Sequence, residues 1–231
     1  MRRSSGRILT AGGTGGADES ARGDASGIIQ GATEFLPVSS SGHLVIGQTL
    51  MHIRIPGVAF EVAVHLATLL SVLLVYRKRV VELAMGMFKG EGRAWRYLGL
   101  LILATVPAAV VGLGAGGFVE ALFDSPAVTG VALLVTGTFL WTSRRALGRG
   151  PAGGPGLVAA LLMGLAQAFA IVPGISRSGA TVVTGLWLKV EAEEAAAFSF
   201  LLAIPAILGA AVLKVPELSD AGVGLGSGVL M

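Results

Sequence analysis

The chain has 231 residues, of which 53% are hydrophobic and only 13% charged, and its formal net charge at pH 7 is +3. Soluble domains carry about a quarter charged residues, so this composition excludes a soluble globular protein and indicates an integral membrane protein. The absence of cysteine excludes disulfide and thiolate chemistry, and three histidines are too few for a metal site built from histidine alone with spare ligands.

Two segments precede the first predicted membrane span. Residues 1–26 are polar and contain no apolar run of signal-peptide type, so we expect them to form a disordered leader. Residues 27–51 are apolar but are interrupted by Pro37 and by three consecutive serines, 39–41. Proline breaks the hydrogen-bond ladder of a helix. Irregular backbone at membrane depth is tolerated only where protein or a water-filled cavity surrounds it. This pattern predicts a helix–loop–helix hairpin that enters the membrane and returns to the same side.

Four apolar stretches are long enough for membrane spans, which need about 20 residues. They are 58–76, 97–116, 125–142 and 194–215. The predicted loops between them alternate in charge, with six basic residues in 77–96, none in 117–124 and three in 143–156. Basic loops face the cytoplasm, so we place 77–96 and 143–156 there and expect no nucleic-acid partner for the basic residues. Trp95, Tyr97 and Trp141 lie near span ends, where aromatic residues anchor helices at the membrane interface.

Residues 157–190 predict a second hairpin, since Pro173, Gly174 and a polar cluster at 176–179 interrupt them. The charge pattern sends this hairpin in from the cytoplasmic side and the first one in from the outside. The predicted fold is therefore an all-α polytopic membrane protein with two inverted-topology repeats, each with a re-entrant helical hairpin.

The predicted domain organisation is a single membrane domain over 27–215. Repeat one covers about 27–142 and repeat two about 157–215. Counterparts of spans 97–116 and 125–142 would fall beyond residue 231, so we expect the second repeat to be incomplete. Residues 216–231 are expected to form a short tail.

The two hairpins contain related sequences, QGATEFLPVSSSG at 30–42 and QAFAIVPGISRSG at 167–179. The pairs that match at this spacing are Gln30 and Gln167, Ser39 and Ser176, Ser41 and Ser178, and Gly42 and Gly179. The differences are complementary: the first copy contains Glu34 and is followed by His43, whereas the second places Arg177 opposite Ser40. We therefore expect the two copies to form one composite site.

The residue types in this site suit a phosphate group. Hydroxyls, glycine-exposed amides and an arginine together supply the many donors that a phosphate requires. The hydroxyl residues are Ser39, Ser40, Ser41, Ser176, Ser178 and Thr181. Gln30 and Glu34 are four residues apart and would share one helix face, where their oxygens would hold Mg²⁺ beside the phosphate. The alternative is that Glu34 and Arg177 form a buried ion pair that only holds the two hairpins together.

The stretches GATEFLPVSSSGHL and PGISRSGATVVTGL closely resemble the two signature regions of undecaprenyl-diphosphate phosphatases of the bacitracin-resistance type, and the resemblance covers roughly residues 28–215. It implies removal of the terminal phosphate from undecaprenyl diphosphate, a polyprenyl diphosphate lipid. The products are undecaprenyl phosphate, the lipid carrier for cell-wall synthesis, and inorganic phosphate. It also implies a Mg²⁺ or Ca²⁺ cofactor, contact with membrane lipids, a location in the bacterial inner membrane and a site that opens to the outer face, and it allows a homodimer.

The resemblance also implies roles for individual residues. The implied catalytic residues are Glu34, Ser40, His43 and Arg177. Glu34 and Gln30 would handle the metal. The implied substrate-binding residues are Gln30, Ser39, Ser41, Gly174, Ser176, Ser178 and Thr181. Either Ser40 or a metal-activated water would be the nucleophile.

Two alternative functions are also compatible with the sequence. Inverted repeats with broken helices are a transporter design, so a polyprenyl-phosphate transporter or flippase is one alternative. An inactive fragment that only binds lipid diphosphate is the other. The combination of serine, glutamate and histidine favours an enzyme, because transport alone requires no nucleophile.

Overall fold

A computed structural model describes residues 36–50, 58–123, 125–146 and 153–220 of the chain. The helices are α2 (Ser40–Leu50), α3 (Val58–Val75), α4 (Arg77–Phe88), α5 (Gly92–Gly114), α6 (Gly116–Phe123), α7 (Pro126–Ala146), α8 (Leu157–Phe169), α9 (Arg177–Trp187) and α10 (Ala192–Asp220). Turns and short connections make up the rest of these ranges, and no strand occurs in them. The all-α fold class is thereby confirmed.

Three of these helices have the length and apolar composition to cross a membrane. They are α5, α7 and the first part of α10, up to Gly209. Large apolar side chains point away from the protein interior: Val110 of α5 is 64% exposed and Leu134 of α7 is 73% exposed. Such exposure is unfavourable in water over so many positions and favourable in lipid. The chain is therefore a membrane protein.

The predicted spans match helices, but two predicted loops were wrong. The segments 77–96 and 117–124 contain α4 and α6 instead of loops. In α4, Val80, Leu83 and Met87 recur at helical spacing between the charged residues, which is the pattern of an amphipathic helix. Val80 and Leu83 pack against the buried core formed by α5, α8 and α10. The charged residues of these segments, on which the orientation rests, are unchanged by this correction.

Helices α5 and α8 approach each other closely at a glycine. A Cβ atom on Gly164 of α8 would lie 2.3 Å from the carbonyl oxygen of Ala104 in α5, so only glycine fits there. Small residues at helix contacts are typical of membrane proteins, where close backbone packing replaces the hydrophobic effect. Met163 and Phe198 fill the adjacent core and are completely buried. This tight core fixes the position of α8, which leads into the second motif.

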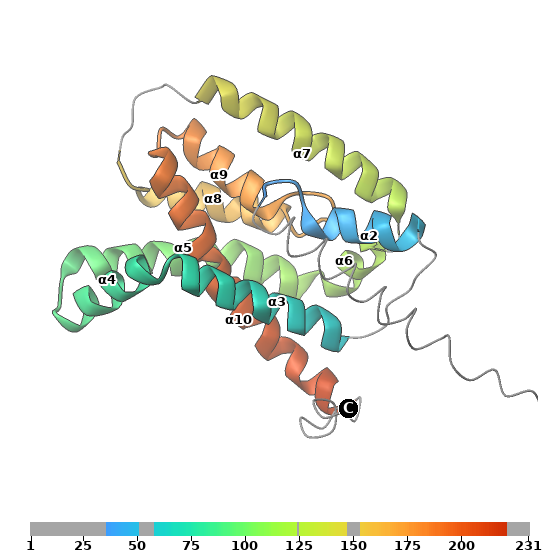
Figure 1. Ribbon diagram of the computed structural model, residues 1–231, viewed down its shortest axis with the longest axis horizontal. Helices are drawn as coiled ribbons and strands as arrows, with labels where there is room; N and C mark the ends of the chain where they lie inside the picture. The colour runs from blue at the N-terminus through green and yellow to red at the C-terminus, as the bar shows by residue number, and fades with distance from the viewer. Residues whose placement is uncertain (1–35, 51–57, 124, 147–152, 221–231) are drawn as a thin grey trace, which may run out of the picture.

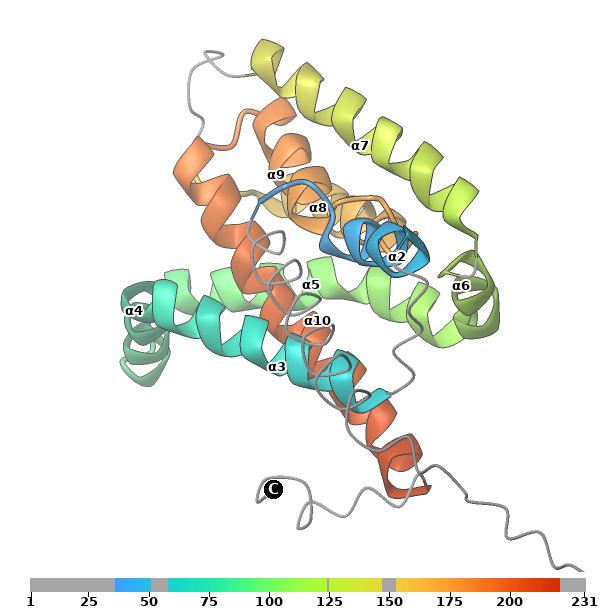
Figure 2. The same ribbon diagram turned by 45° about the vertical axis from the view of Figure 1, so that its right-hand side comes forward.

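Helix α7 lies along one side of the molecule and covers both motif helices (Figure 1). Helices α2 and α9 each pack against it, although they come from distant parts of the sequence. The rotated view shows the same arrangement, with α10 crossing toward α3 and α5 (Figure 2). The two motifs are therefore held on one common support.

The contacts of Tyr97 differ from its predicted role as an anchor at the membrane interface. Tyr97 does not serve as an interfacial anchor, because its ring packs edge-on against Phe198 with 5.6 Å between ring centroids. The Arg79 guanidinium lies 5.2 Å from the centre of the Tyr97 ring and donates to both carboxylate oxygens of Glu194, at 2.8 and 2.9 Å. This ion pair holds the start of α10 beside α4. Trp95 and Trp141, by contrast, are more than half exposed near the ends of α5 and α7.

Candidate functional site

The first motif becomes describable at Leu36, where a turn leads to α2. Ser39 has a φ of +67°, in the left-handed region that non-glycine residues seldom occupy. Its Oγ accepts a hydrogen bond from the Gly42 amide at 3.3 Å and lies 3.3 Å from Ser41 Oγ. Ser39 is thus the residue that caps α2, and Ser40 is the first residue of the helix. Gln30 and Glu34 lie outside the described residues, so the predicted metal site is not located.

The second motif repeats the serine cap of the first, but its left-handed residue lies two positions before the capping serine. Gly174 has a φ of +97°, and Ser176 then caps α9 by accepting from the Gly179 amide at 3.1 Å. Ser176 Oγ also lies 3.4 Å from Ser178 Oγ. Arg177 is the first residue of α9, the position that Ser40 has in α2. Both helices begin directly after the capping serine, so the repeated sequence produces a repeated cap and a repeated helix start.

The two motif segments touch each other. A Cβ atom on Gly42 would lie 2.8 Å from the Cα atom of Gly174, and one on Gly179 would lie 3.1 Å from the Pro37 carbonyl oxygen. Glycine at these positions therefore permits backbone contact between segments that are far apart in the sequence. The N-termini of α2 and α9, each with its positive dipole end, are brought into one region. Such a region is suited to binding an anion.

The geometry of His43 determines which of its ring nitrogens holds a proton. Nδ1 lies 2.8 Å from the Ser39 carbonyl oxygen, which can only accept. Nδ1 therefore carries the hydrogen in neutral histidine, and the lone pair is on Nε2. The side chain is exposed at the start of α2, three residues after Ser40. Nε2 is therefore the ring nitrogen of neutral His43 that can accept a hydrogen bond.

Hydroxyl groups on neighbouring helices hold the second motif, and sequence reasoning missed them. Thr136 of α7 donates to the Gly174 carbonyl oxygen at 2.8 Å and accepts from the Ser176 amide at 3.0 Å. Ser199 of α10 lies within hydrogen-bond distance of the Thr181 hydroxyl. The only available signal was the presence of hydroxyl residues inside apolar spans, and it did not reveal their partners.

The predicted site residues differ in their burial and in their hydrogen bonds within the protein. The Thr181 hydroxyl is fully buried and donates toward the carbonyl oxygens of Arg177 and Ser178 in its own helix. Ser176 and Ser178 are also buried, whereas Ser40, Ser41 and Arg177 are only partly buried. That Thr181 binds substrate remains a prediction. The described contacts show it as support for the first turn of α9.

Gln167 is the counterpart of Gln30, and it is buried without a partner. Its side chain is 3% exposed, and neither its amide nitrogen nor its amide oxygen has a hydrogen-bond partner in the structure. A buried amide that lacks partners costs about 1–3 kcal/mol, which makes Gln167 a position to test by substitution. Among the described residues, no three histidine, cysteine or acidic side chains gather as metal ligands.

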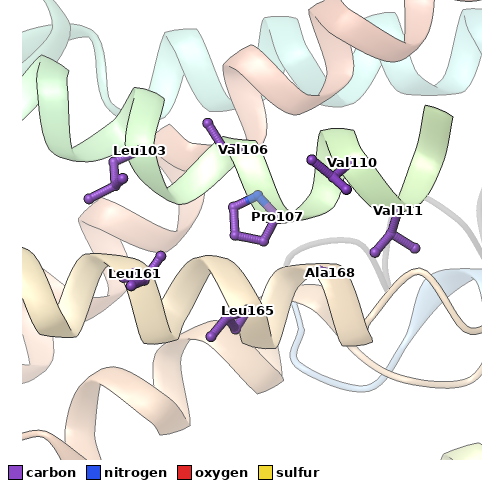
Figure 3. A pocket seen from close by; sticks show the side chains of 8 residues that line it. All are labelled: Leu103, Val106, Pro107, Val110, Val111, Leu161, Leu165 and Ala168. Atoms are coloured by element: carbon purple, nitrogen blue, oxygen red, sulfur yellow. The ribbon is translucent and has the colours of Figure 1, made fainter. Parts of the chain in front are cut away.

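A separate cavity of about 380 Å³ lies between α5 and α8 (Figure 3). Its lining consists of Leu103, Val106, Pro107, Val110, Val111, Leu161, Leu165 and Ala168. The lining is entirely apolar and offers no group for acid–base or phosphate chemistry. The polar candidate residues lie instead at the contact of the two motifs.

Comparison with known proteins identifies the family. The model of the bacitracin resistance protein BacA family matches residues 25–229. An undecaprenyl-diphosphatase of Desulforapulum autotrophicum is 41% identical over 225 residues, covering 89% of this chain and 80% of the relative. An undecaprenyl-diphosphatase of Desulfosudis oleivorans is 43% identical over 215 residues, covering 87% of this chain and 78% of the relative. One from Oceanobacillus iheyensis is 41% identical over 201 residues, covering 83% and 73%. The chain belongs to the BacA family of bacitracin resistance proteins.

Proposed function

We propose that this chain is an undecaprenyl-diphosphatase, which hydrolyses undecaprenyl diphosphate to undecaprenyl phosphate and inorganic phosphate. The observation that carries this proposal is the contact between the two motifs, which joins two serine-capped helix N-termini. Relatives that are about 40% identical to this chain over most of its length are named undecaprenyl-diphosphatase. A transporter would require the phosphate-binding region but no nucleophile, so hydrolysis is favoured over transport.

The described residues support a division of roles in phosphoryl transfer. Arg177 at the start of α9 would bind two oxygens of the terminal phosphate in a bidentate arrangement. The amides at the start of both helices would bind further oxygens. Attack on the terminal phosphorus by Ser40 Oγ or by a water breaks the bond to the bridging oxygen, which leaves with undecaprenyl phosphate. Attack by a water gives inorganic phosphate directly, whereas attack by Ser40 gives a phosphoserine that a water then hydrolyses to inorganic phosphate and free serine. His43 would accept the proton of the attacking group at Nε2.

The proposed divalent cation is Mg²⁺ or Ca²⁺, with Glu34 and Gln30 as its ligands from the chain. When bound, it would neutralise charge on the diphosphate. The hydroxyl and arginine groups of the described residues are hydrogen-bond donors, which suit a phosphate and not a cation. The cation ligands are therefore proposed in the part of the first motif that contains Gln30 and Glu34.

The second hairpin supports a re-entrant path through the membrane. The Glu191 amide, after α9, donates to the Gly153 carbonyl oxygen, before α8, at 3.0 Å, so the hairpin begins and ends at one place. Helix α8 has 13 residues and is roughly 20 Å long, less than the thickness of the hydrocarbon core, about 30 Å. We propose that this hairpin enters from the cytoplasmic side, that the first enters from the outside as part of an inverted repeat, and that the site opens outward from the bacterial inner membrane.

Release of inorganic phosphate from undecaprenyl diphosphate by the purified chain in detergent tests the proposed function. We expect phosphate release that depends on added Mg²⁺ or Ca²⁺ and stops with a chelator. Equal amounts of undecaprenyl phosphate and inorganic phosphate should appear. Release no faster than without protein would contradict the proposal and would leave lipid binding or transport as the function.

A further inference from the structure

We propose that Thr136, on α7, is a positioning residue of this reaction: it holds the turn that places Ser176 and Arg177 at the start of α9. This inference rests on the proposed function for its link to catalysis. Thr136 lies 40 residues before Ser176 in the sequence. It lies outside both motifs, so its role derives from the fold alone.

One hydroxyl of Thr136 connects two backbone groups of the turn. It donates to the Gly174 carbonyl oxygen at 2.8 Å and accepts from the Ser176 amide at 3.0 Å. Thr136 is 6% exposed and Ser176 2% exposed, so water does not compete for these bonds. The donor and one acceptor site of the hydroxyl are thus both used by backbone atoms two residues apart. This arrangement fixes the turn in both directions at its tightest point.

The position of this turn determines the position of the first turn of α9, where the phosphate is proposed to bind. Ser176 is the cap of α9, and its Oγ accepts from the Gly179 amide. A shift of the Ser176 backbone therefore moves the first turn of α9, which begins with Arg177. Since phosphoryl transfer depends on position and charge more than on covalent chemistry, a small displacement of these donors lowers the rate strongly.

The same face of α7 limits movement of both motifs. A Cβ atom on Gly174 would lie 2.5 Å from the Thr129 carbonyl oxygen and 2.7 Å from Ala132 Cβ. One on Gly42 would lie 3.0 Å from Leu133 Cδ2. Thr136 continues this face of the helix by one turn and is its hydrogen-bonding member. Close backbone packing at Gly174 holds the turn against α7, and the two hydrogen bonds of the Thr136 hydroxyl fix the orientation of the turn.

The test compares Thr136→Val, which keeps the shape and removes both hydrogen bonds, with Thr136→Ser, which keeps the hydroxyl. We expect Thr136→Val to lower kcat by about tenfold to a hundredfold, with a smaller change in KM, because the transition state is more sensitive to donor position than substrate binding is. Thr136→Ser should retain kcat to within a few fold. Thr138→Val is the matched control. Thr138 is exposed on the same helix and donates only to the Leu134 carbonyl oxygen of its own helix.

The assay is run on the monodisperse fraction, well below the thermal unfolding midpoint of each variant. A merely structural role would lower that midpoint in Thr136→Val but leave kcat per folded molecule unchanged, and this result would overturn the proposal. An equal loss of kcat in Thr136→Ser would overturn it as well. If Thr136→Val does not fold, Thr136→Cys takes its place, because its thiol forms only weak hydrogen bonds. The cysteine side chain is intermediate in size between serine and threonine, so size alone predicts an intermediate kcat. We expect instead a kcat below that of both Thr136→Ser and wild type.

A binding measurement separates failure of this inference from failure of the proposed function. Inorganic pyrophosphate with Mg²⁺ should raise the thermal unfolding midpoint of wild type and of Thr136→Ser, and raise it less for Thr136→Val. If wild type releases no phosphate but shows this pattern, the proposed hydrolysis is wrong and positioning by Thr136 stands. If wild type hydrolyses the lipid but all variants have equal kcat and equal pyrophosphate protection, Thr136 has no positioning role. Absence of both activity and protection in wild type would contradict both proposals.

Discussion

Arg177 has the chemistry and the location that suit the proposed role of binding the terminal phosphate. It is partly buried at the first position of α9, directly after the Ser176 cap. At this place its guanidinium and the positive dipole end of the helix can act on the same anion. The alternative from the sequence, an ion pair between Glu34 and Arg177 that only holds the hairpins together, would give this arginine a structural role.

Arg177→Lys separates the two roles. Lysine keeps the charge but cannot form two parallel hydrogen bonds to a phosphate, so we expect kcat/KM to fall on the order of a hundredfold while the protein still inserts and folds. Phosphate release by the purified variant measures this. Arg144→Lys, at an exposed position near the end of α7, is the control and should behave as wild type. Near-normal turnover of Arg177→Lys would identify a structural arginine.

Glu34→Gln tests the proposed cation site. Glu34 is the one carboxylate in the two motif copies, 30–42 and 167–179. Because an amide oxygen is a weaker ligand for a hard cation, we expect the Mg²⁺ concentration for half-maximal activity to rise by roughly tenfold or more. The measurement is a Mg²⁺ titration of phosphate release. Glu82→Gln, on the exposed side of α4, is the matched control, and an unchanged titration for Glu34→Gln would remove Glu34 from the cation site.

Gln167→Met should stabilise the protein in the absence of ligand. The amide of Gln167 is buried and has no hydrogen-bond partner in the structure, and methionine has a similar shape without the polar atoms. We expect the free energy of unfolding to rise by roughly 1 kcal/mol, seen as a higher thermal midpoint in detergent. Gln167→Glu keeps the size, adds a charge and should lower the midpoint. A lower midpoint for Gln167→Met would show that the amide is satisfied by a bound water.

At the scale of single residues, the sequence predicted the motif residues but not what holds them. The paired serines, Gly42 and Gly179 and the complementary placement of Arg177 and His43 are visible as a repeated pattern. Thr136 was missed because its partners are backbone atoms of a distant segment, and backbone partners leave no residue type to recognise. The Ser199 contact with Thr181 was missed for a related reason, since a serine inside an apolar span has no periodic signature.

At the scale of elements, the hydrophobic runs predicted helices well and their boundaries less well. Spans 97–116 and 125–142 correspond to α5 and α7, whose full extents are Gly92–Gly114 and Pro126–Ala146. Polar residues continue a helix beyond the apolar part that pattern reasoning detects. The same effect hid α4, whose charged residues were taken as a loop. An amphipathic helix of 12 residues is shorter than a span and is recognised only by its spacing.

Gly164→Ala tests the close packing of α5 and α8. The added Cβ would lie 2.3 Å from the Ala104 carbonyl oxygen, so one helix must move. We expect the free energy of unfolding to fall by roughly 1–3 kcal/mol, measured as a lower thermal midpoint. Gly99→Ala is the control on α5, where a Cβ meets nothing within 4 Å. This change should be neutral or stabilising by up to about 1 kcal/mol. Equal midpoints for the two variants would show that the contact at Gly164 is loose.

At the scale of the whole molecule, two contacts constrain the path of the chain. The Arg79–Glu194 ion pair places the start of α10 beside α4, and the Glu191–Gly153 hydrogen bond closes the α8–α9 hairpin. The two ends of this hairpin therefore lie beside each other and close to α4. Charge counting had assigned 77–96 and 143–156 to one face independently. The contacts agree with this assignment. A segment that crossed the membrane once between Gly153 and Glu191 would separate these residues by the hydrocarbon core, about 30 Å thick.

Single cysteines test this topology, because the chain contains none of its own. The positions are Arg93→Cys and Glu193→Cys, both expected to face the cytoplasm, and Phe118→Cys in α6, expected to face outward; all three residues are exposed. A membrane-impermeant maleimide applied to spheroplasts should label only Phe118→Cys, and permeabilisation should expose all three positions. Labelling of Glu193→Cys together with Phe118→Cys in intact spheroplasts would mean that the second hairpin crosses the membrane. In that case the inverted repeat would be wrong. Labelling of Arg93→Cys and Glu193→Cys without Phe118→Cys would instead reverse the whole orientation and place the site opening on the cytoplasmic face, while keeping the re-entrant hairpin.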